Sequence, residues 1–289
     1  MNPAFANNNP GNLSKGEVKF ADLHLHTFYS DGTYSPEELV IKAKKAGLST
    51  IAIADHDTVD AIEPALIAAK EYDLEIIPGI ELTAEHNKTE VHILGYFIDH
   101  KDKSLLRELN SLASYRNERI HKITDKLKEM GIDFDPKAVF DISGCGTVGR
   151  LHIARAMVKL GIISNTQEAF QKYIGDKCPA YVCGFRFSPE EAISLIKKVG
   201  GVAVLAHPYI FHDPEIITEF VKYGIDGLEV YYPEHTQSMI NQFLDYAKKY
   251  NLLITGGSDC HGKAKPEVKI GMIKLPYEFV EKLKEASKR

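Results

Sequence analysis

Seven short apolar runs, separated by segments of helical periodicity, constrain the fold of this chain more than any other feature of its sequence. The runs cover residues 20–26, 50–56, 74–82, 91–97, 202–207, 227–232 and 252–259. Two of the intervening helices have clear start signals, because Ser35 and Ser188 are each followed by Pro and, three positions after the Ser, by Glu. This alternation predicts a parallel sheet with crossover helices, either a barrel or a doubly wound sheet.

Residues 101–186 interrupt the alternation. They have helical periodicity but no convincing buried strand. Either they form a crossover helix with a long loop, or they form a mostly helical insertion between two parts of one barrel. We favour the insertion, because a structureless loop of that length is unusual. The expected organisation is a polar, flexible tail over 1–18, barrel over 19–100, a substrate-binding insertion over 101–186 and barrel again over 187–289.

Composition excludes several classes of protein. The 289 residues are 44% hydrophobic, so the chain can bury a sizeable core, and its net charge of −5 argues against a surface that binds long nucleic acids. No stretch approaches the ~20 apolar residues of a membrane span. The four cysteines form no C-x-x-C pair. We therefore expect neither a disulfide framework nor a cysteine zinc site, and free thiols favour the cytoplasm.

The chain also has twelve histidines, several of which stand where an apolar run ends. His24 and His26 alternate on the first run, so both imidazoles point to the same face, about 7 Å apart. Similar positions are taken by Asp31, His56, Glu81, His92, His207, Asp259 and His261. In a parallel barrel the carboxyl ends of the strands meet on one face, where the active sites of such folds lie. We therefore expect these nine side chains to converge and to bind divalent metal ions.

Other polar residues near these runs have structural explanations. Asp57 is expected to cap a helix that begins near Thr58, and Asp55 either to orient a neighbouring histidine or to support the site from behind the ligands. Considered alone, His207 could equally be a strand-ending histidine held by hydrogen bonds. His152 has no assigned role. The remaining histidines are expected on the surface: His86, His100, His121, His212 and His235.

Six motifs make the pattern recognisable: H-x-H-T-x-x-S-D-G, A-D-H-D-T, P-G-I-E, H-x-L-G-Y, A-H-P and S-D-x-H, in this order. Together they resemble the PHP family, named for polymerase and histidinol phosphatase, over roughly residues 20–100 and 188–262. The resemblance implies an α/β fold, namely a distorted TIM-like (β/α)7 barrel. It also implies two or three metal ions at the carboxyl ends of the strands.

The resemblance further implies how the ligands are divided among the metal ions. The division is His24, His26, Glu81 and Asp259 for the first ion; Glu81, His92 and His207 for the second; and Asp31, His56 and His261 for the third. Nitrogen and oxygen donors without thiolates suit Mn, Zn or Fe ions, and the ligand types do not choose among them.

Such a cluster suits the hydrolysis of phosphate esters. Metal binding lowers the pKa of water toward about 7, so a metal-activated hydroxide can attack at neutral pH, and the cations neutralise charge on the phosphoryl oxygens. The sequence has no G-x-S-x-G or similar nucleophile motif. We expect Glu81, Asp259 and His207 to act in catalysis, with His207 a candidate for the acid that protonates the leaving group.

The insertion offers candidate substrate-binding residues. An apolar stripe at helical spacing within 112–130 includes Arg116, and Arg119 lies three residues further along. One interpretation is that Arg116 packs its aliphatic stem while its charged end reaches water. The other is that the guanidinium groups of Arg116, Arg119 and Arg150 bind a second phosphate of the substrate, for which Arg is better suited than Lys.

The insertion is similar to that of one branch of the PHP family. Known members of this branch hydrolyse nucleoside 3′,5′-bisphosphates and remove nucleotides from RNA 5′ ends. The branch usually has Pro where this chain has Leu151. The implied function is phosphate release from a nucleoside 3′,5′-bisphosphate, with 5′–3′ trimming of short RNA as a further activity. The expected partner is a small phosphorylated molecule, with no membrane and no long nucleic acid, and the oligomeric state is open. Alternatives are a histidinol-phosphate-type phosphomonoesterase, a polymerase-associated proofreading module and a non-catalytic metal-binding regulatory protein.

Overall fold

The computed structural model describes residues 18–87, 89–144, 146–183, 187–211 and 215–289, so residues 1–17 of the predicted tail lie outside the described part. Seven strands follow the seven apolar runs: β1 (Phe20–Leu25), β2 (Thr50–Ile53), β3 (Glu75–His86), β4 (Thr89–Tyr96), β5 (Val202–Leu205), β6 (Gly227–Tyr231) and β7 (Leu253–Gly256). A short strand near the end of the chain, β8 (Leu275–Pro276), pairs with the start of β1.

The strands form one sheet in the order β7-β6-β5-β4-β3-β2-β1-β8. Strands β1 to β3 are parallel to one another, and so are β5 to β7. Strand β4 is antiparallel to both of its neighbours, so the prediction of a wholly parallel sheet is wrong at this strand. Only residues 87 and 88 separate β3 from β4, and so short a connection cannot cross over to a parallel partner.

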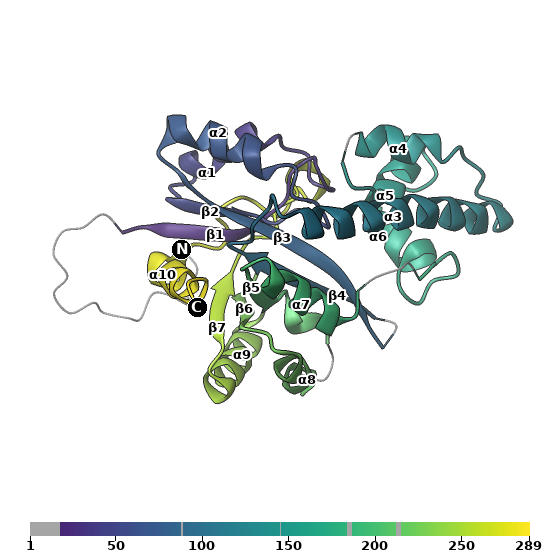
Figure 1. Cartoon of the computed structure of the whole chain (residues 1–289). Helices are drawn as coiled ribbons and strands as arrows, with labels where there is room; N and C mark the ends of the chain where they lie inside the picture. Colours follow the sequence, from purple (N-terminus) through teal and green to yellow (C-terminus); the bar gives the residue numbers. More distant parts are fainter. Residues whose placement is uncertain (1–17, 88, 145, 184–186, 212–214) are drawn as a thin grey trace.

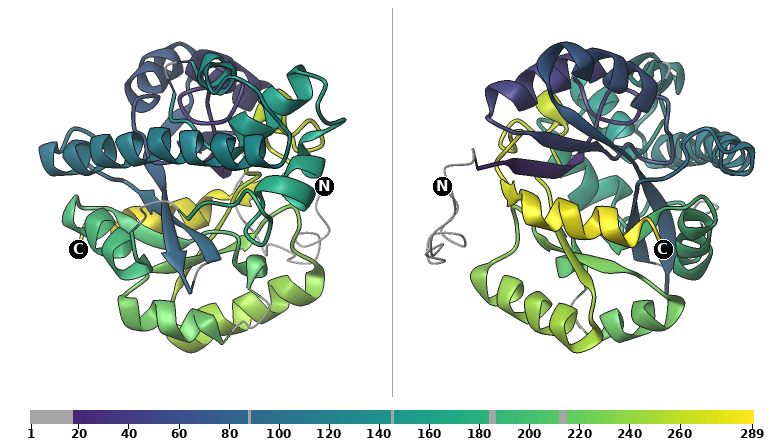
Figure 2. Two further views of the ribbon diagram at one scale, coloured as in Figure 1. Left: turned by 90° about the vertical axis from the view of Figure 1, so that its right-hand side faces the viewer. Right: turned by 60° about the vertical axis from the view of Figure 1, so that its left-hand side comes forward.

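The sheet curls into a nearly closed barrel, around which the helices are arranged (Figure 2). The segment after β7 bridges the remaining gap: the N–H of Asp259 donates to His24 O over 2.8 Å, and the N–H of His26 donates to Cys260 O over 3.2 Å. A Cβ atom at Gly257 would collide with the backbone of His24, so glycine permits this close approach. The predicted fold class, a distorted TIM-like barrel, is confirmed.

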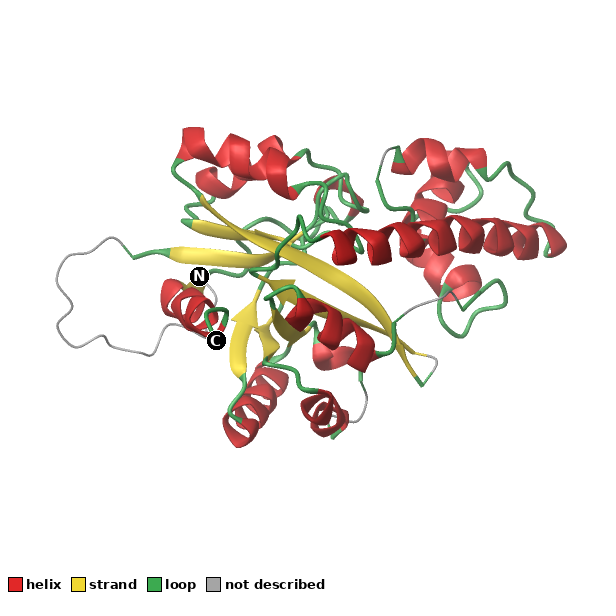
Figure 3. Cartoon of the chain, in the orientation of Figure 1, coloured by secondary structure: helices red, strands yellow, loops and turns green. Residues whose placement is uncertain are grey.

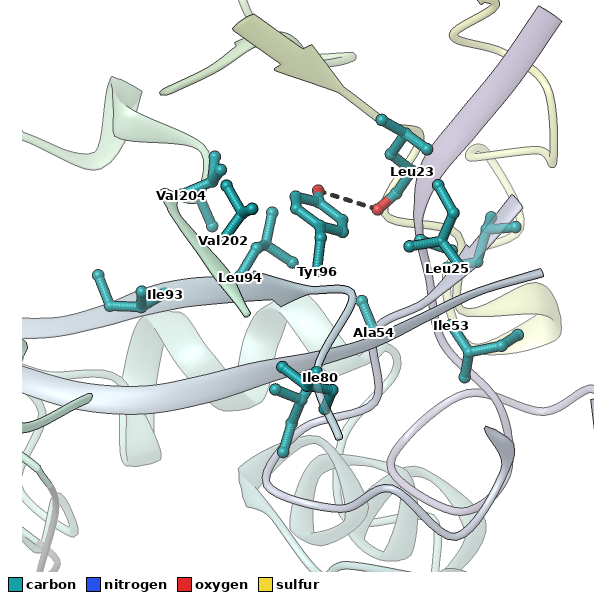
Figure 4. Packing of buried hydrophobic residues seen from close by; sticks show 14 of the residues in the cluster. Leu23, Leu25, Ile53, Ala54, Ile80, Ile93, Leu94, Tyr96, Val202 and Val204 are labelled. Carbon is teal, nitrogen blue, oxygen red and sulfur yellow. Dashed lines mark hydrogen bonds between the residues drawn. The ribbon is translucent and has the colours of Figure 1, made fainter. Parts of the chain in front are cut away.

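The core of the barrel consists of apolar side chains from all of its long strands. In Figure 4, Tyr96 lies beside Leu94 on one side of β3 and β4, while Ile80 lies on the other side of these strands. The fully buried Tyr96 donates its hydroxyl to Leu23 O over 3.1 Å, which provides the partner that a buried polar group needs. Most polar exceptions to this apolar pattern lie toward one end of the barrel, where they form the site described below.

Six helices pack around the barrel (Figures 1 and 3): α1 (Pro36–Lys45), α2 (Ile62–Tyr72), α7 (Pro189–Lys198), α8 (Ile216–Tyr223), α9 (Gln237–Tyr250) and α10 (Tyr277–Ala286). Helices α1 and α7 begin where the sequence predicts. Ser35 and Ser188 each accept the N–H of the Glu three positions later, and that Glu accepts the N–H of the serine in return. Among the described residues, no helix is both long and apolar enough to cross a membrane.

The remaining helices form a group at one end of the barrel (Figure 1): α3 (Lys103–Glu129), α4 (Lys137–Ser143), α5 (Arg150–Lys159) and α6 (Thr166–Ala169), followed by a π-helical turn, Phe170–Ile174. They enclose a second apolar core that includes Ile120, Ile123, Val139, Ile153 and Met157. The first turns of α3 instead contribute Leu105, Leu109 and Leu112 to the barrel core. Helix α3 therefore belongs to both units, and the predicted domain boundaries at 101 and 186 stay predictions.

Candidate functional site

The nine predicted ligands lie together at one end of the barrel. His24 is on β1, Glu81 is on β3 and His92 is on β4, while the others follow the strand ends: His26 and Asp31 after β1, His56 after β2, His207 after β5, and Asp259 and His261 after β7. The strand register explains why Glu81 and His92 can be ligands although they lie within β3 and β4 rather than after a strand end. Because β4 is antiparallel and pairs His92 with Thr83, its beginning lies at the end of the barrel where the parallel strands finish.

The ligand atoms form three overlapping groups in which every pair of atoms lies within 4.8 Å. The groups are His24, His26, Glu81 and Asp259; His26, Asp31, His56 and His261; and His56, Glu81 and His92. His207 adjoins the third group, because its Nε2 lies 3.1 Å from Glu81 Oε1 and 3.3 Å from His92 Nδ1. The first group equals the predicted first metal site. In the structure His26 belongs to both the first and the second group, and His56 belongs to both the second and the third. The predicted division of the ligands among metal ions stays a prediction.

Buried atoms without hydrogen bonds show that this cluster suits cations. Within the described residues, the candidate ligands have six such atoms: His24 Nε2, His26 Nε2, His56 Nδ1, His207 Nδ1, Asp31 Oδ1 and Glu81 Oε2. Several of them face other atoms of the cluster: His26 Nε2, for example, lies 3.0 Å from Asp259 Oδ1 and 3.3 Å from Glu81 Oε2 without hydrogen-bond geometry. Buried polar atoms are normally paired. Imidazole nitrogens and carboxylate oxygens that face a common centre fit Zn, Mn or Fe ions.

The side chains of the cluster perturb one another strongly. Burial acts to raise the pKa of Glu81, but the neighbouring His92, His56 and His24 outweigh it and hold the pKa well below its usual range. Burial likewise acts to lower the pKa of His26, yet the carboxylates of Asp259 and Glu81 raise it to about 9. The carboxylates of Asp259 and Glu81 thus favour a protonated His26. A divalent ion must displace protons when it binds, which makes its affinity depend on pH.

Glu229 supports the cluster from behind, and sequence reasoning missed it. The fully buried carboxylate accepts a hydrogen bond from His24 Nδ1 over 2.9 Å, which turns His24 Nε2 toward the cluster. Its other oxygen accepts the backbone N–H of His207 over 2.9 Å. A carboxylate behind a ligating histidine fixes the orientation of the ring and raises its basicity. The available signal was an acidic residue within the apolar run Gly227–Tyr231.

The two aspartates that flank His56 have different roles. Asp55 accepts hydrogen bonds from Thr27 N over 2.7 Å and from Ser30 Oγ over 2.5 Å, so it holds the loop after β1, and burial raises its pKa. This agrees with the expected supporting role. The prediction that Asp57 caps a helix is wrong, because α2 begins at Ile62 without a side-chain cap. Asp57 pairs with Arg116 instead.

A cleft of about 250 Å³ lies over the cluster, and the three predicted arginines line it. Arg116 donates to Asp57 Oδ2 over 2.8 Å and to Thr83 Oγ1 over 2.7 Å. Arg119 donates to Val182 O over 2.8 Å. The structure therefore brings the arginines next to the candidate ligands. The buried carboxylate of Asp57 holds Arg116 at the cleft, and the role of Arg116 in substrate binding stays a prediction.

Arg150 has two acidic neighbours in the same cleft. Its Nη1 lies 2.6 Å from Asp176 Oδ1, and its Nη2 lies 3.1 Å from Glu90 Oε2. Its guanidinium also lies over the rings of Phe170 and Tyr181. These contacts hold a planar cation at a defined position in the cleft, and a guanidinium group suits the binding of an oxyanion.

Two further cleft residues were missed by the sequence reasoning. Lys265 Nζ and the hydroxyl of Tyr232 each lie 2.8 Å from Asp259 Oδ2, so both orient a predicted metal ligand. The only sequence signal for Lys265 was its position four residues after His261. Tyr232 ends an apolar run, where an aromatic residue is common and does not indicate a functional role.

The histidines outside the cluster only partly match expectation. His121 is exposed as predicted, and His212 lies outside the described residues. The prediction of surface positions is wrong for His86 and His235, which are buried, because His86 packs on Phe220 and His235 donates from Nδ1 to Val230 O. His152 now has a role: its Nδ1 accepts the N–H of Gly149 over 3.0 Å at the start of α5.

The chain is similar to known proteins over most of its length. The model of the PHP domain matches residues 22–175. A 5′-3′ exoribonuclease from Haemophilus influenzae is 35% identical over 252 residues, covering 84% of this chain and 90% of that protein. A 3′,5′-nucleoside bisphosphate phosphatase from Chromobacterium violaceum is 30% identical over 250 residues, covering 83% of this chain and 86% of that protein.

A solved structure has the same architecture. The crystal structure of a Bifidobacterium adolescentis protein, described as a metal-dependent phosphoesterase, matches with a TM-score of 0.84 and 31% identity, covering 92% of this chain and 96% of that one. The domain match covers more than half of this chain, and the sequence relatives cover most of it. This chain therefore belongs to the PHP domain family of phosphoester hydrolases.

Proposed function

We propose that this chain releases phosphate from nucleoside 3′,5′-bisphosphates in a metal-dependent reaction. The observation that carries the proposal is the composition of one cleft, which is lined at once by the candidate metal ligands and by Arg116, Arg119 and Arg150. The similarity to a 3′,5′-nucleoside bisphosphate phosphatase supports it. A second activity, the 5′–3′ trimming of short RNA, is favoured by the similarity to a 5′-3′ exoribonuclease.

We propose two or three Mn, Zn or Fe ions as the cofactor. The residues that would hold them are the nine ligands of the cluster: His24, His26, Asp31, His56, Glu81, His92, His207, Asp259 and His261. When bound, such ions lower the pKa of water and neutralise charge on phosphoryl oxygens. The chain itself supplies the orientation: Glu229 holds His24, and Lys265 and Tyr232 hold Asp259.

The chain can divide a substrate with two phosphates between two parts of the cleft. The scissile phosphate would lie at the cluster, near Glu81 and His207. The other phosphate would lie against Arg119 and Arg150. A cleft of about 250 Å³ suits a small nucleotide or the end of a strand. The expected cytoplasmic location stays a prediction.

The test is a phosphate-release assay with protein reconstituted with each metal. The substrates are adenosine 3′,5′-bisphosphate, AMP, a short 5′-phosphorylated RNA and histidinol phosphate. We expect the highest kcat/KM for the bisphosphate. Equal or higher values for histidinol phosphate would favour the phosphomonoesterase alternative. Metal binding without phosphate release from any ester would favour the non-catalytic one.

Two variants are compared with the wild type in the same assay. Glu81→Ala removes a ligand shared by two groups of the cluster, and we expect loss of phosphate release from every substrate. Arg107→Ala removes an exposed charge from the same helix as Arg116 and Arg119. Because Arg107 lies outside the cleft lining, its substitution controls for a general change in charge.

A further inference from the structure

Glu90, on β4, lies between the cluster and the arginines. Its carboxylate lines the cleft and is 18% exposed. Oε1 lies 3.3 Å from His92 Nε2, while Oε2 lies 3.1 Å from Arg150 Nη2 and 3.6 Å from Arg119 Nη1. One short side chain therefore contacts a predicted metal ligand and two predicted phosphate-binding residues.

The two sides that Glu90 connects belong to different packing units. His92 and Glu90 are on the barrel strand β4, where both pair with residues of β3. Arg150 begins α5, and the apolar side chains of α5 pack in the second core. Helix α3, which carries Arg119, packs in both cores and so joins them. Polar contacts across the cleft add to this connection, and those of Glu90 with Arg119 and Arg150 are direct.

We propose that Glu90 is a positioning residue that sets the separation between the metal cluster and the arginine pair Arg119–Arg150, and so determines the preference for substrates with two phosphates. This inference rests on the proposed function. A residue on a paired strand defines geometry better than a loop residue does. The carboxylate can hold both guanidinium groups through charge-assisted hydrogen bonds and ion pairs.

A competing role predicts the opposite effect. If Glu90 were only a counter-ion that occupies the place of a phosphate, its removal would strengthen the binding of every anion, because a like charge would leave the cleft. If Glu90 positions the arginines, its removal weakens the binding of a substrate that needs both phosphate sites at once. The sign of the change in affinity separates the two roles.

The experiment compares Glu90→Gln and Glu90→Ala with the wild type and with Glu108→Gln, which changes an exposed carboxylate on α3. Binding of a non-hydrolysable analogue of adenosine 3′,5′-bisphosphate and of AMP to metal-loaded protein is measured by calorimetry. We expect Glu90→Ala to weaken bisphosphate binding about tenfold, the size of one charge-assisted hydrogen bond. AMP binding should change less, Glu90→Gln should fall between Glu90→Ala and the wild type, and Glu108→Gln should match the wild type.

A second readout uses protein with saturating metal, whose metal content is measured because Glu90 also contacts His92. The ratio of kcat/KM for the bisphosphate to that for p-nitrophenyl phosphate should fall about tenfold in Glu90→Ala. The fall in the double variant Glu90→Ala/Arg150→Ala should be smaller than the product of the two single falls, since both changes act on the contact between Glu90 and Arg150, while Arg119 keeps its own contact with Glu90 to lose.

Unchanged or tighter bisphosphate binding by the Glu90 variants would overturn the inference. So would a substrate ratio equal to that of the wild type. Wild-type protein that is fully loaded with metal but does not hydrolyse the bisphosphate would instead overturn the proposed function. The two failures are thus distinguishable, because the first is seen in the variants and the second in the wild type.

Discussion

Replacing Arg116 by Ala tests whether this arginine is held by Asp57 as the structure shows. The Asp57 side chain is 1% exposed and that of Arg116 is 15% exposed. The substitution leaves the carboxylate of Asp57 with its hydrogen bond from Thr83 N, 2.8 Å long, and without its charged partner. Breaking a buried ion pair from one side costs about 3–5 kcal/mol. At about 2–4 °C per kcal/mol, we expect Tm to fall by about 6–20 °C.

The assay is a double-mutant cycle measured by urea denaturation of the full chain. Arg116→Ala, Asp57→Ala and the double variant are compared with the wild type, with Arg107→Ala as the exposed control on α3. The double variant should lose clearly less stability than the sum of the two single variants, because it leaves no unpaired buried charge. Losses that add within about 0.5 kcal/mol would refute a coupled pair. A loss of the same size in Arg107→Ala would show that the effect is not local.

Three further expectations follow from particular contacts. Glu229→Ala removes the carboxylate behind His24, and we expect metal affinity to fall about 10–100-fold by equilibrium dialysis; unchanged affinity would contradict the supporting role. Burial lowers the pKa of His152 from 6.5 to about 4, so the unfolded chain takes up the proton first as pH falls. Stability from neutral His152 is therefore complete above about pH 6.5 and is lost as pH falls toward 4. The variant His152→Gln keeps an acceptor for the N–H of Gly149, and urea midpoints should show a flatter pH dependence in this window; an identical slope would refute the assignment. Arg150→Ala should lower kcat/KM for adenosine 3′,5′-bisphosphate far more than for an aryl phosphate, and equal losses would defeat a role in binding the second phosphate.

Much of the barrel could be predicted, because local sequence signals determine its strands. Each apolar run became a strand, and the two Ser-Pro starts became helices with reciprocal caps. The nine candidate ligands could be found for the same reason: each is a polar residue at or near the end of an apolar run. The antiparallel direction of β4 was harder to predict from the sequence. The two residues between β3 and β4 identify a hairpin, but strand–helix alternation elsewhere in the chain favoured a parallel sheet.

The features of the site that the sequence did not predict depend on contacts between residues that are far apart in the chain. The local sequence around Asp57 is typical of a helix cap, but Asp57 instead pairs with Arg116, which is 59 residues away in the chain. Glu229 and His24 are 205 residues apart and meet only because β6 and β1 belong to one barrel. The same holds for Glu90, whose contacts with Arg119 and Arg150 join the barrel to the helical insertion. Periodicity and spacing describe single elements, so they cannot show which side chains two distant elements bring together.

The most direct test of the account is phosphate release from adenosine 3′,5′-bisphosphate by protein that has been stripped with a chelator and then titrated with Mn. The account predicts no release by the stripped protein and a rise in kcat as metal ions fill the cluster, with Glu81→Ala inactive throughout. Full activity in the stripped protein, or no phosphate release at full metal occupancy, would contradict it.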